Sequence, residues 1–250
     1  MIGACAVIPY YEHPQTLPVT VEALRRHGLT CFIVDDGSSS AASAIASQLA
    51  AHDPATVKLI THATNRGKGA AVLSGARAAA AAGFTHALQV DADGQHDLDD
   101  VPELLAQAES HPEALILGTP RFDASMPRAR LYGRYLTHLW VWVNTLSLEV
   151  ADSMCGFRVY PLAALLAVAD SERLGRRMEF DTEVVVRLHW RGVPMIGVPT
   201  RVTYPRDGVS HFDLWHDNLR ISGMHARLFF GMLLRMPGLL LRRLRGATRR

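Results

Sequence analysis

The chain has 250 residues, of which 48% are hydrophobic and 20% charged, so it holds enough apolar material for one large domain with its own core. Its net charge of +2 favours no class of partner, and its three widely spaced cysteines form no CxxC pair or metal-binding spacing, which fits a reducing cytoplasm. No uninterrupted apolar run of about 18 residues is present, and the first residues reach proline and glutamate too early for a secretory leader, so we expect a protein kept on the cytoplasmic side.

Short apolar runs alternate with helical patterns through the first half of the chain. The runs that we expect to form buried strands cover residues 4–9, 31–36, 57–62, 86–91 and 114–119. Helices are expected between them, over residues 16–28, 40–52, 69–84 and 97–111. This alternation predicts a mostly parallel sheet with helices on both faces, in which ligands gather beyond the carboxyl ends of the strands.

The second half of the chain has a less regular pattern. We expect a helix over residues 128–148, a loop over 152–157, a helix over 178–192 and a short strand over 194–199. A last helix should run from Asp213 to Met236 and Pro237, where the proline is expected to end it. The chain therefore divides into a domain over residues 1–212 and a C-terminal helical segment over residues 213–250.

The C-terminal segment differs from the rest of the chain in its charge. From Leu219 to Arg250 there are eight arginines and no acidic residue, which gives this part +8 and leaves −6 on the remainder. Its mixture of leucine, phenylalanine and methionine with spaced arginines predicts an interfacial helix on an anionic membrane surface. The alternative is an ordinary helix packed on the core with a solvated basic end. Nucleic acid is not an expected partner, because the body is acidic and no recognition motif accompanies the arginines.

The stretch LQVDADGQHD, residues 88–97, leads a short apolar strand into three aspartates. Carboxylates this close repel one another unless a positive charge lies among them. Because side chains alternate along an extended segment, Asp91, Asp93 and Gln95 should share one side. Two carboxylates and an amide oxygen suit a divalent cation, Mg²⁺ or Mn²⁺, that retains waters or phosphate oxygens. An acidic strand end is a weak signal by itself, so the other loops have to support it.

Two further loops favour a nucleoside diphosphate as the ligand. NRGKG, residues 65–69, places Arg66 and Lys68 at a helix start, where free N–H groups and the helix dipole attract anions. VDDGSSS, residues 34–40, offers Asp35 or Asp36 to a base or a ribose hydroxyl. The spacing fits neither a P-loop nor a GxGxxG turn. The structural alternatives are a glycine turn with solvated charges for the first loop and an acidic helix cap for the second.

Six motifs together resemble those of a known family. In chain order they are IPYYEH, VDDGSSS, NRGKGAAVLSG, VDADGQHD, MCGFRVY and RDGVSH. Over residues 4–211 the sequence resembles the family-2 inverting glycosyltransferases of the GT-A fold, and among these it is similar to the polyprenyl-phosphate sugar transferases. The resemblance implies an α/β/α sandwich with a mostly parallel central sheet that binds a nucleotide sugar. Residues 115–160 are further similar to a bacterial subgroup linked with acylated lipids or aryl-polyene pigments.

The resemblance also implies which residues bind the donor. The positions expected to contact its base, ribose or diphosphate are Pro9, Tyr11, Glu12, Asp35 or Asp36, Lys68, Asp91, Arg206, Ser210 and His211. The last three match an R-x-x-G-x-S-K element that folds over the diphosphate. Two departures from the family pattern matter. Glu12 stands where asparagine is usual, which leaves the base preference open, and His211 replaces the expected lysine.

A metal site and a reacting centre follow from the same resemblance. Asp93 and Gln95 would ligate Mg²⁺ or Mn²⁺, and Asp91 would contact the ribose and help to position the ion. Such a cation neutralises the charge that develops on the departing nucleotide. Arg158, in the motif GFR, would face the donor sugar or the acceptor phosphate.

The chemical nature of the acceptor decides whether the enzyme needs a base. A hydroxyl that attacks with inversion must lose its proton to a carboxylate, for which Asp181 is our first choice and Glu183 our second. A lipid phosphate is already ionised and needs no base. The structural alternative for residues 179–183 is a helix N-terminus stabilised by acidic side chains.

The expected function is transfer of a sugar from a UDP- or GDP-sugar to a lipid, a polyprenyl phosphate or an acylated lipid. The enzyme would be peripheral on the inner face of the cell membrane. Two alternatives remain open. A nucleotidyltransferase usually has an early glycine-rich basic loop, and residues 8–17 contain none. A catalytically silent nucleotide-binding or membrane-scaffold protein is disfavoured by the intact Asp91, Asp93 and Gln95.

Overall fold

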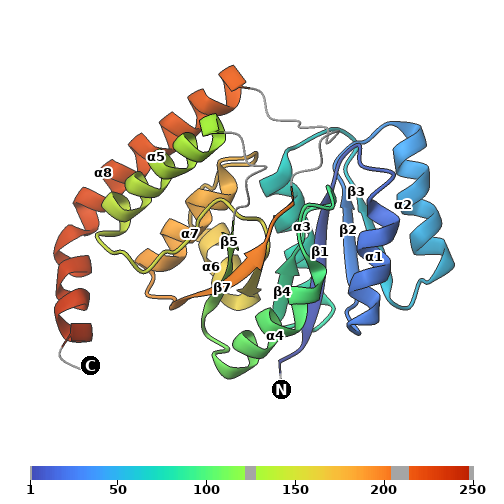
Figure 1. Ribbon diagram of the computed structural model, residues 1–250, viewed down its shortest axis with the longest axis horizontal. Helices are drawn as coiled ribbons and strands as arrows, with labels where there is room; N and C mark the ends of the chain where they lie inside the picture. The colour runs from blue at the N-terminus through green and yellow to red at the C-terminus, as the bar shows by residue number, and fades with distance from the viewer. Residues whose placement is uncertain (1, 122–127, 204–213, 248–250) are drawn as a thin grey trace.

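The computed structural model describes residues 2–121, 128–203 and 214–247, which are built around one sheet (Figure 1). Its seven strands lie in the order β3-β2-β1-β4-β6-β5-β7. Their bounds are β1 (Ala4–Tyr10), β2 (Cys31–Asp35), β3 (Val57–Thr61), β4 (His86–Gln89), β5 (Leu115–Arg121), β6 (Arg158–Pro161) and β7 (Met195–Arg201). Of these strands only β6 runs antiparallel to its neighbours, β4 and β5. The predicted α/β class with a mostly parallel sheet is confirmed.

Helices cover both faces of the sheet and make a three-layer sandwich (Figure 1). One face carries α1 (Leu17–Arg26), α2 (Ser40–His52) and α4 (Val101–Ser110), the last entered through the short 3-10 turn η1 (Leu98–Asp100). The other face carries α3 (Lys68–Ala81), α6 (Leu162–Ser171) and α7 (Phe180–Trp190), with α5 (Arg128–Thr145) and α8 (Leu214–Ala247) beside them. The predicted sandwich architecture is therefore confirmed.

The strands separate two apolar cores. Along β1, Cys5 and Val7 belong to the core under α3 and α7, whereas Ala6 and Ile8 belong to the core under α1 and α4. Every residue of β2 is buried, because helices lie over both sides of it. This two-sided burial explains why the strands are continuous apolar runs rather than alternating patterns.

Two elements of the second half were not predicted from the sequence, and both follow the loop over residues 152–157. β6 is four residues long and pairs with both β4 and β5, and α6 starts directly after it. The strand contains an arginine and a proline, and no turn residue separates it from the helix. Neither the apolar-run rule nor the turn signals could therefore mark its limits.

The prediction that Pro237 ends the last helix is wrong, since α8 continues to Ala247. A proline inside a helix removes one N–H donor and crowds the preceding turn. Contacts beyond the proline compensate for this cost. Leu239 is buried, and Arg242 donates to the carbonyl oxygens of His189 and Trp190 at 3.0 and 2.9 Å. These carbonyls lie at the end of α7, and the His189 oxygen also accepts the backbone N–H of Gly192 at 2.9 Å. Tertiary contacts at a helix end therefore override the local stop signal.

Candidate active site

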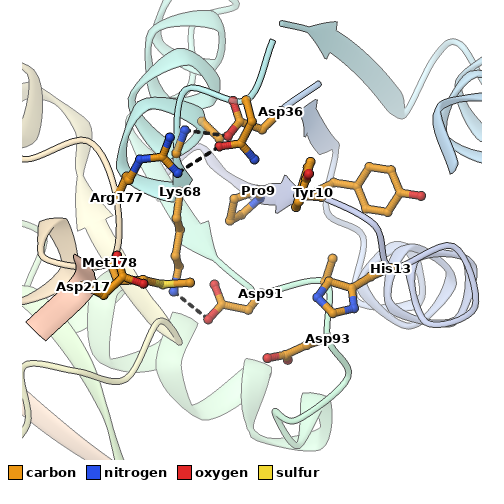
Figure 2. Close-up of a pocket in the computed structure, with 15 residues that line it drawn as sticks. Pro9, Tyr10, His13, Asp36, Lys68, Asp91, Asp93, Arg177, Met178 and Asp217 are labelled. Carbon is orange, nitrogen blue, oxygen red and sulfur yellow. Dashed lines mark hydrogen bonds and ion pairs between the residues drawn. The ribbon is translucent and has the colours of Figure 1, made fainter. Parts of the chain in front are cut away.

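A cavity of about 540 Å³ opens beyond the carboxyl ends of β1, β2 and β4, where the sequence places its polar loops (Figure 2). The first turn of α3, the segment before α7 and the first turns of α8 complete its wall. The predicted site residues that it brings together are Pro9, Tyr11, Asp36, Lys68, Asp91 and Asp93. Loops that are far apart in the sequence therefore form one site.

Lys68 is the positive charge among the aspartates. Its Nζ lies 2.7 Å from Asp91 Oδ2 and 2.7 Å from Asp181 Oδ2 (Figure 2 shows the pair with Asp91). Lys68 is the first residue of α3, and Gly67 before it has a φ of 99°, which glycine adopts without strain. A Cβ at position 67 would also overlap the carbonyl oxygen of Arg176. The glycine thus allows the turn that sends the lysine across the cavity.

The bridge keeps its members charged. Burial lowers the pKa of the Lys68 amine, but the carboxylates of Asp181 and Asp91 outweigh burial and raise it above its ordinary value. Burial raises the pKa of Asp91, but Lys68 and His96 outweigh it and hold that pKa well below the usual range. His96 Nε2 lies 3.6 Å from Asp91 Oδ2, slightly beyond hydrogen-bond distance. We conclude that Lys68 and Asp91 form a true ion pair at neutral pH.

Asp181 is held from below by two buried side chains. Gln89 Nε2 donates to Asp181 Oδ1 at 3.2 Å, and Arg158 Nη1 donates to the Asp181 carbonyl oxygen at 2.8 Å. Arg158 is fully buried, and its Nε donates to the Cys155 carbonyl oxygen at 2.9 Å. The guanidinium therefore lies under the site and not on the cavity wall, so the expectation that Arg158 faces the sugar or phosphate has to be corrected.

Glu183, the second candidate base, is engaged away from the cavity. Its side chain is fully buried, its Oε2 accepts the backbone N–H of Gly175 at 2.7 Å, and its Oε1 lies 2.7 Å from Arg187 Nη2. Asp181, the first candidate, forms an ion pair with the Lys68 amine. Both carboxylates lie in the first turn of α7. Neither can accept a proton without weakening a buried ion pair, which is costly.

The two aspartates after β2 point to different places. Asp36 lines the cavity, accepts the backbone N–H of Arg66 and Gly67 at 2.9 and 2.7 Å, and lies 2.6 Å from His62 Nδ1. Asp35 is buried on the other side, where it accepts the N–H of Ser38 at 3.0 Å and the hydroxyl of Ser43 in α2. Of the two alternatives, Asp36 belongs to the cavity and Asp35 holds the start of a helix.

Two other predicted residues, Glu12 and Gln95, are not part of the cavity lining. Glu12 has a φ of 56°, and its carboxylate accepts hydrogen bonds from the N–H and hydroxyl of Ser39 at the start of α2. The chain leaves the extended conformation after β4 and turns at Gly94, whose φ is 73°. The alternation assumed for Asp93 and Gln95 is therefore wrong, and Gln95 is not part of the lining.

Some lining residues were missed, and some predicted residues cannot be placed. Arg206, Ser210 and His211 lie outside the described residues. His13, Asn65, Arg177, Met178 and Asp217 line the cavity without having been singled out. Arg177 and Met178 directly precede the acidic stretch at residues 179–183, which is the one local signal that could have found them. Asp217 comes from the last helix, and no nearby motif marks it.

Asp91 and Asp93 fit a divalent cation whose remaining ligands come from a donor molecule. Asp91 Oδ1 is buried without a hydrogen-bond partner, although its Oδ2 has Lys68, and Asp93 lies along the same wall (Figure 2). Within the ranges that the structure describes, no three His, Cys, Asp or Glu side chains form a complete metal site. Few carboxylates and several open positions suit Mg²⁺ or Mn²⁺ bound together with phosphate oxygens and water.

The chain is similar in sequence to known proteins. Residues 5–165 match the Glycosyl transferase family 2. The chain belongs to this family. It is 26% identical over 199 residues to the undecaprenyl-phosphate mannosyltransferase of Micrococcus luteus, covering 77% of this chain and 80% of that protein. It is 25% identical over 218 residues to the polyprenol monophosphomannose synthase of Mycolicibacterium smegmatis, covering 82% of this chain and 78% of that protein.

Solved structures confirm the fold. The glucosyl-3-phosphoglycerate synthase of Mycobacterium tuberculosis, crystallised with Mn²⁺, UDP and phosphoglyceric acid, superposes with a TM-score of 0.64 at 15% identity, covering 93% of this chain and 78% of that chain. The same enzyme with Mn²⁺ and UDP-glucose gives a TM-score of 0.62. The protein is thus a GT-A-fold glycosyltransferase of family 2, as the resemblance of its motifs implied.

Gly156 provides a test of the Lys68 bridge. A Cβ at this position would lie 2.8 Å from Lys68 Nζ and 2.8 Å from Asp91 Oδ1. In Gly156→Ala only the ends of two side chains have to move, so we expect a loss of about 1 kcal/mol in the free energy of unfolding, at the low end for overpacking. Sugar transfer should fall about 100-fold, because displacement of reacting groups by about 1 Å has that effect.

The matched control is Gly133→Ala in α5, where an added Cβ meets nothing within 4 Å. Urea unfolding gives the stability of each variant, and release of nucleoside diphosphate gives its activity. Wild-type turnover in Gly156→Ala would contradict the importance of the bridge.

Proposed function

We propose that the protein transfers a sugar from a UDP- or GDP-sugar to the phosphate group of a polyprenyl or related lipid, with inversion and with Mg²⁺ or Mn²⁺. The observation that carries this choice is the state of the two candidate bases. Asp181 is bound to Lys68, and Glu183 is bound to Arg187, so neither is available to take a proton from a hydroxyl. A phosphate acceptor is already ionised. The names of the relatives from Micrococcus and Mycolicibacterium, which refer to polyprenyl phosphates, support the same acceptor.

The residues of the cavity suggest how the donor would bind. Pro9, Tyr11 and Asp36 form the part of the wall beyond β1 and β2, where a base and ribose would lie. Lys68 and Arg177 provide positive charge for the diphosphate. Asp91 and Asp93 would hold the cation, which supplies further charge neutralisation to the leaving nucleotide when it is bound. This arrangement places the cationic groups on the leaving-group side of the sugar.

The bond changes of the reaction are balanced without a base. A phosphate oxygen of the acceptor forms a bond to the anomeric carbon as the bond from that carbon to the donor diphosphate breaks. The bonding electron pair leaves with the nucleoside diphosphate, and no proton has to be removed from the acceptor. In this scheme Asp181 is a positioning residue that fixes Lys68, and Arg158 and Gln89 fix Asp181.

We further propose that α5 and α8 lie on the membrane surface that contains the acceptor. Figure 1 shows the two helices side by side at one end of the molecule, and they pack against each other. Phe230, Leu234 and Leu241 of α8 are exposed by 64%, 84% and 50%, and Tyr132 and Tyr135 of α5 by 72% and 64%. An exposed apolar stripe of this kind suits the interface of a bilayer.

Two arginines of α8 bind the domain itself. Arg242 binds the end of α7, and the Arg235 guanidinium lies 4.7 Å from the ring centre of Trp190. These two side chains hold α8 on the domain, and we expect the apolar stripe to make contact with lipid. No helix in the described part of the chain is long and apolar enough to span a membrane. We place the enzyme on the inner face of the cell membrane as a peripheral protein.

Acceptor specificity tests the proposed function directly. The wild-type protein with Mn²⁺ and a panel of UDP- and GDP-sugars should release nucleoside diphosphate with a polyprenyl phosphate but not with the corresponding polyprenol. The measurement is nucleoside diphosphate released per unit time, with identification of the glycolipid by mass spectrometry. Equal rates with the polyprenol would show that a hydroxyl can be the acceptor and that a catalytic base is needed. Donor binding without release across the panel would favour a silent nucleotide-binding protein.

The metal assignment predicts the effect of Asp93→Asn. This change removes one negative ligand, so Mn²⁺-dependent binding of UDP or GDP should weaken and turnover should fall by about 100-fold or more, as for the loss of one electrostatic stabiliser. The control is Asp99→Asn, since Asp99 is exposed on the same loop region outside the cavity. Calorimetric titration of the nucleotide with and without Mn²⁺ gives the binding. An unchanged Mn²⁺ dependence in Asp93→Asn would remove this residue from the metal site.

The membrane proposal predicts the effect of polar residues in the apolar stripe. Leu234→Gln combined with Leu241→Gln should release the protein from vesicles that contain phosphatidylglycerol, with little change in melting temperature because both side chains are exposed. Val19→Gln on α1 is the control, as Val19 is 71% exposed on the opposite layer. Co-sedimentation with vesicles gives the bound fraction. If the double variant sediments like the wild type, α8 is an ordinary packed helix.

A further inference from the structure

A second cavity, of about 710 Å³, adjoins the donor cavity and is walled mainly by arginines. We call it the arginine basin. It is formed by Arg66, Arg173, Arg176, Arg177, Arg187, Arg220 and Arg227. These residues come from the loop before α3, the segment between α6 and α7, α7 itself and the first half of α8. Arg177 lines both cavities, so the basin and the donor cavity share a wall.

Three of these arginines are paired with acidic side chains. Arg187 lies 2.7 Å from Glu183 Oε1, and Arg227 lies 3.6 Å from Glu183 Oε2. Arg220 lies 3.0 Å from Asp217, which lines the donor cavity. These pairs fix α7 and α8 around the basin, and they do not neutralise its remaining charge.

The other four arginines have no carboxylate within ion-pair distance in the described part of the chain. Arg66, Arg173 and Arg176 make no side-chain ion pair there, and Arg177 Nη1 donates only to the amide oxygen of Asn65, at 3.3 Å. Guanidinium groups gathered in one cavity repel one another. A bound anion with several oxygens would remove this repulsion, and phosphate matches the forked geometry of the guanidinium donors.

The loop that carries these arginines is held in place by Glu179. This residue is 8% exposed, and its Oε1 accepts the backbone N–H of Arg176 and Arg177 at 3.2 and 3.4 Å. A Cβ at Gly175 would overlap the Glu179 side chain, so the close approach requires glycine. Because the carboxylate serves backbone donors, it orders the loop without neutralising its guanidinium groups. Glu172 also lines the basin, but it is paired with Arg187 and Arg191. Glu179 is then the remaining lining carboxylate against four arginines that have no ion pair among the described residues, so the basin stays positive.

We propose that the arginine basin binds the phosphate group of the lipid acceptor, an inference that rests on the proposed function and names the place where its second substrate is held. The two cavities meet at Arg177, so a phosphate in the basin would adjoin the donor cavity. α8 supplies Arg220 and Arg227 to the basin and carries the exposed apolar stripe further along its length. A lipid whose phosphate is bound in the basin therefore has an apolar surface for its chain.

The test compares Arg173→Gln combined with Arg176→Gln against the wild type, in detergent micelles. Both side chains are exposed and make no ion pair with the residues that the structure describes, so the variant should fold normally. Its control is Arg26→Gln combined with Arg77→Gln, which removes the same charge from exposed arginines outside the basin. The dissociation constant for a short-chain polyprenyl phosphate should rise about tenfold or more in the basin variant only, as expected for lost charge-assisted hydrogen bonds. Mn²⁺-dependent binding of UDP or GDP should stay within about twofold of the wild type.

Several outcomes would overturn the proposal. One is an unchanged affinity for polyprenyl phosphate in the basin variant, and another is a wild type that binds the corresponding polyprenol as tightly. Weaker nucleotide binding to the same degree would assign the basin to the donor. Loss of binding to phosphatidylglycerol vesicles, with acceptor affinity in micelles preserved, would assign it to bulk membrane lipid. Failure of the wild type to transfer any sugar would refute the proposed function. Because binding is measured without turnover, the experiment would still show whether the basin binds the lipid phosphate.

Discussion

Lys68 bridges Asp91, which follows β4, and Asp181, which lies in the first turn of α7, with both distances at 2.7 Å. Removing the amine would leave two largely buried carboxylates without a counter-charge, which costs several kcal/mol of free energy. The bridge joins the parallel half of the sheet to the second half of the chain. Gly67 and Gly156 leave room for it, and Arg158 holds its far end from the core.

The same bridge determines what chemistry the site can support. By occupying Asp181 and one oxygen of Asp91, Lys68 leaves the other Asp91 oxygen and Asp93 to meet a cation and a diphosphate. A carboxylate bound to an ammonium group is a poor proton acceptor, so an acceptor that is already ionised suits the site best. The arginine basin adds the positive charge that such an acceptor would need. The acceptor class that we propose thus follows from the same interaction that sets the electrostatics of the site.

Much of the site could be predicted because it follows local rules. Polar residues after buried parallel strands meet at one edge of the sheet, which brings Asp36, Lys68, Asp91 and Asp93 together as expected. Local rules fail where the backbone departs from them. Gln95 was assigned by strand alternation, but Gly94 turns the chain before it. The sequence could leave Asp35 and Asp36 only as alternatives, because the end of β2 decides which one faces the cavity.

Other features depend on contacts between distant segments, and the sequence could not predict them. Burial of Arg158 follows from the antiparallel insertion of β6 between β4 and β5. The helix passes Pro237 because Arg242 binds the two carbonyl oxygens at the end of α7. The arginine basin joins residues 66, 173–177, 187, 220 and 227, and all of them come together only once α8 lies beside α7.

Anomalous diffraction from a crystal soaked with Mn²⁺ and either UDP or GDP would show whether Asp91 and Asp93 hold a cation while Lys68 keeps its bridge. We expect a manganese peak between Asp91 Oδ1 and the carboxylate of Asp93, with the diphosphate beside it and the Lys68 amine still bound to Asp181. A peak away from these two aspartates, or a Lys68 amine that has left Asp181 when the nucleotide is bound, would contradict this expectation.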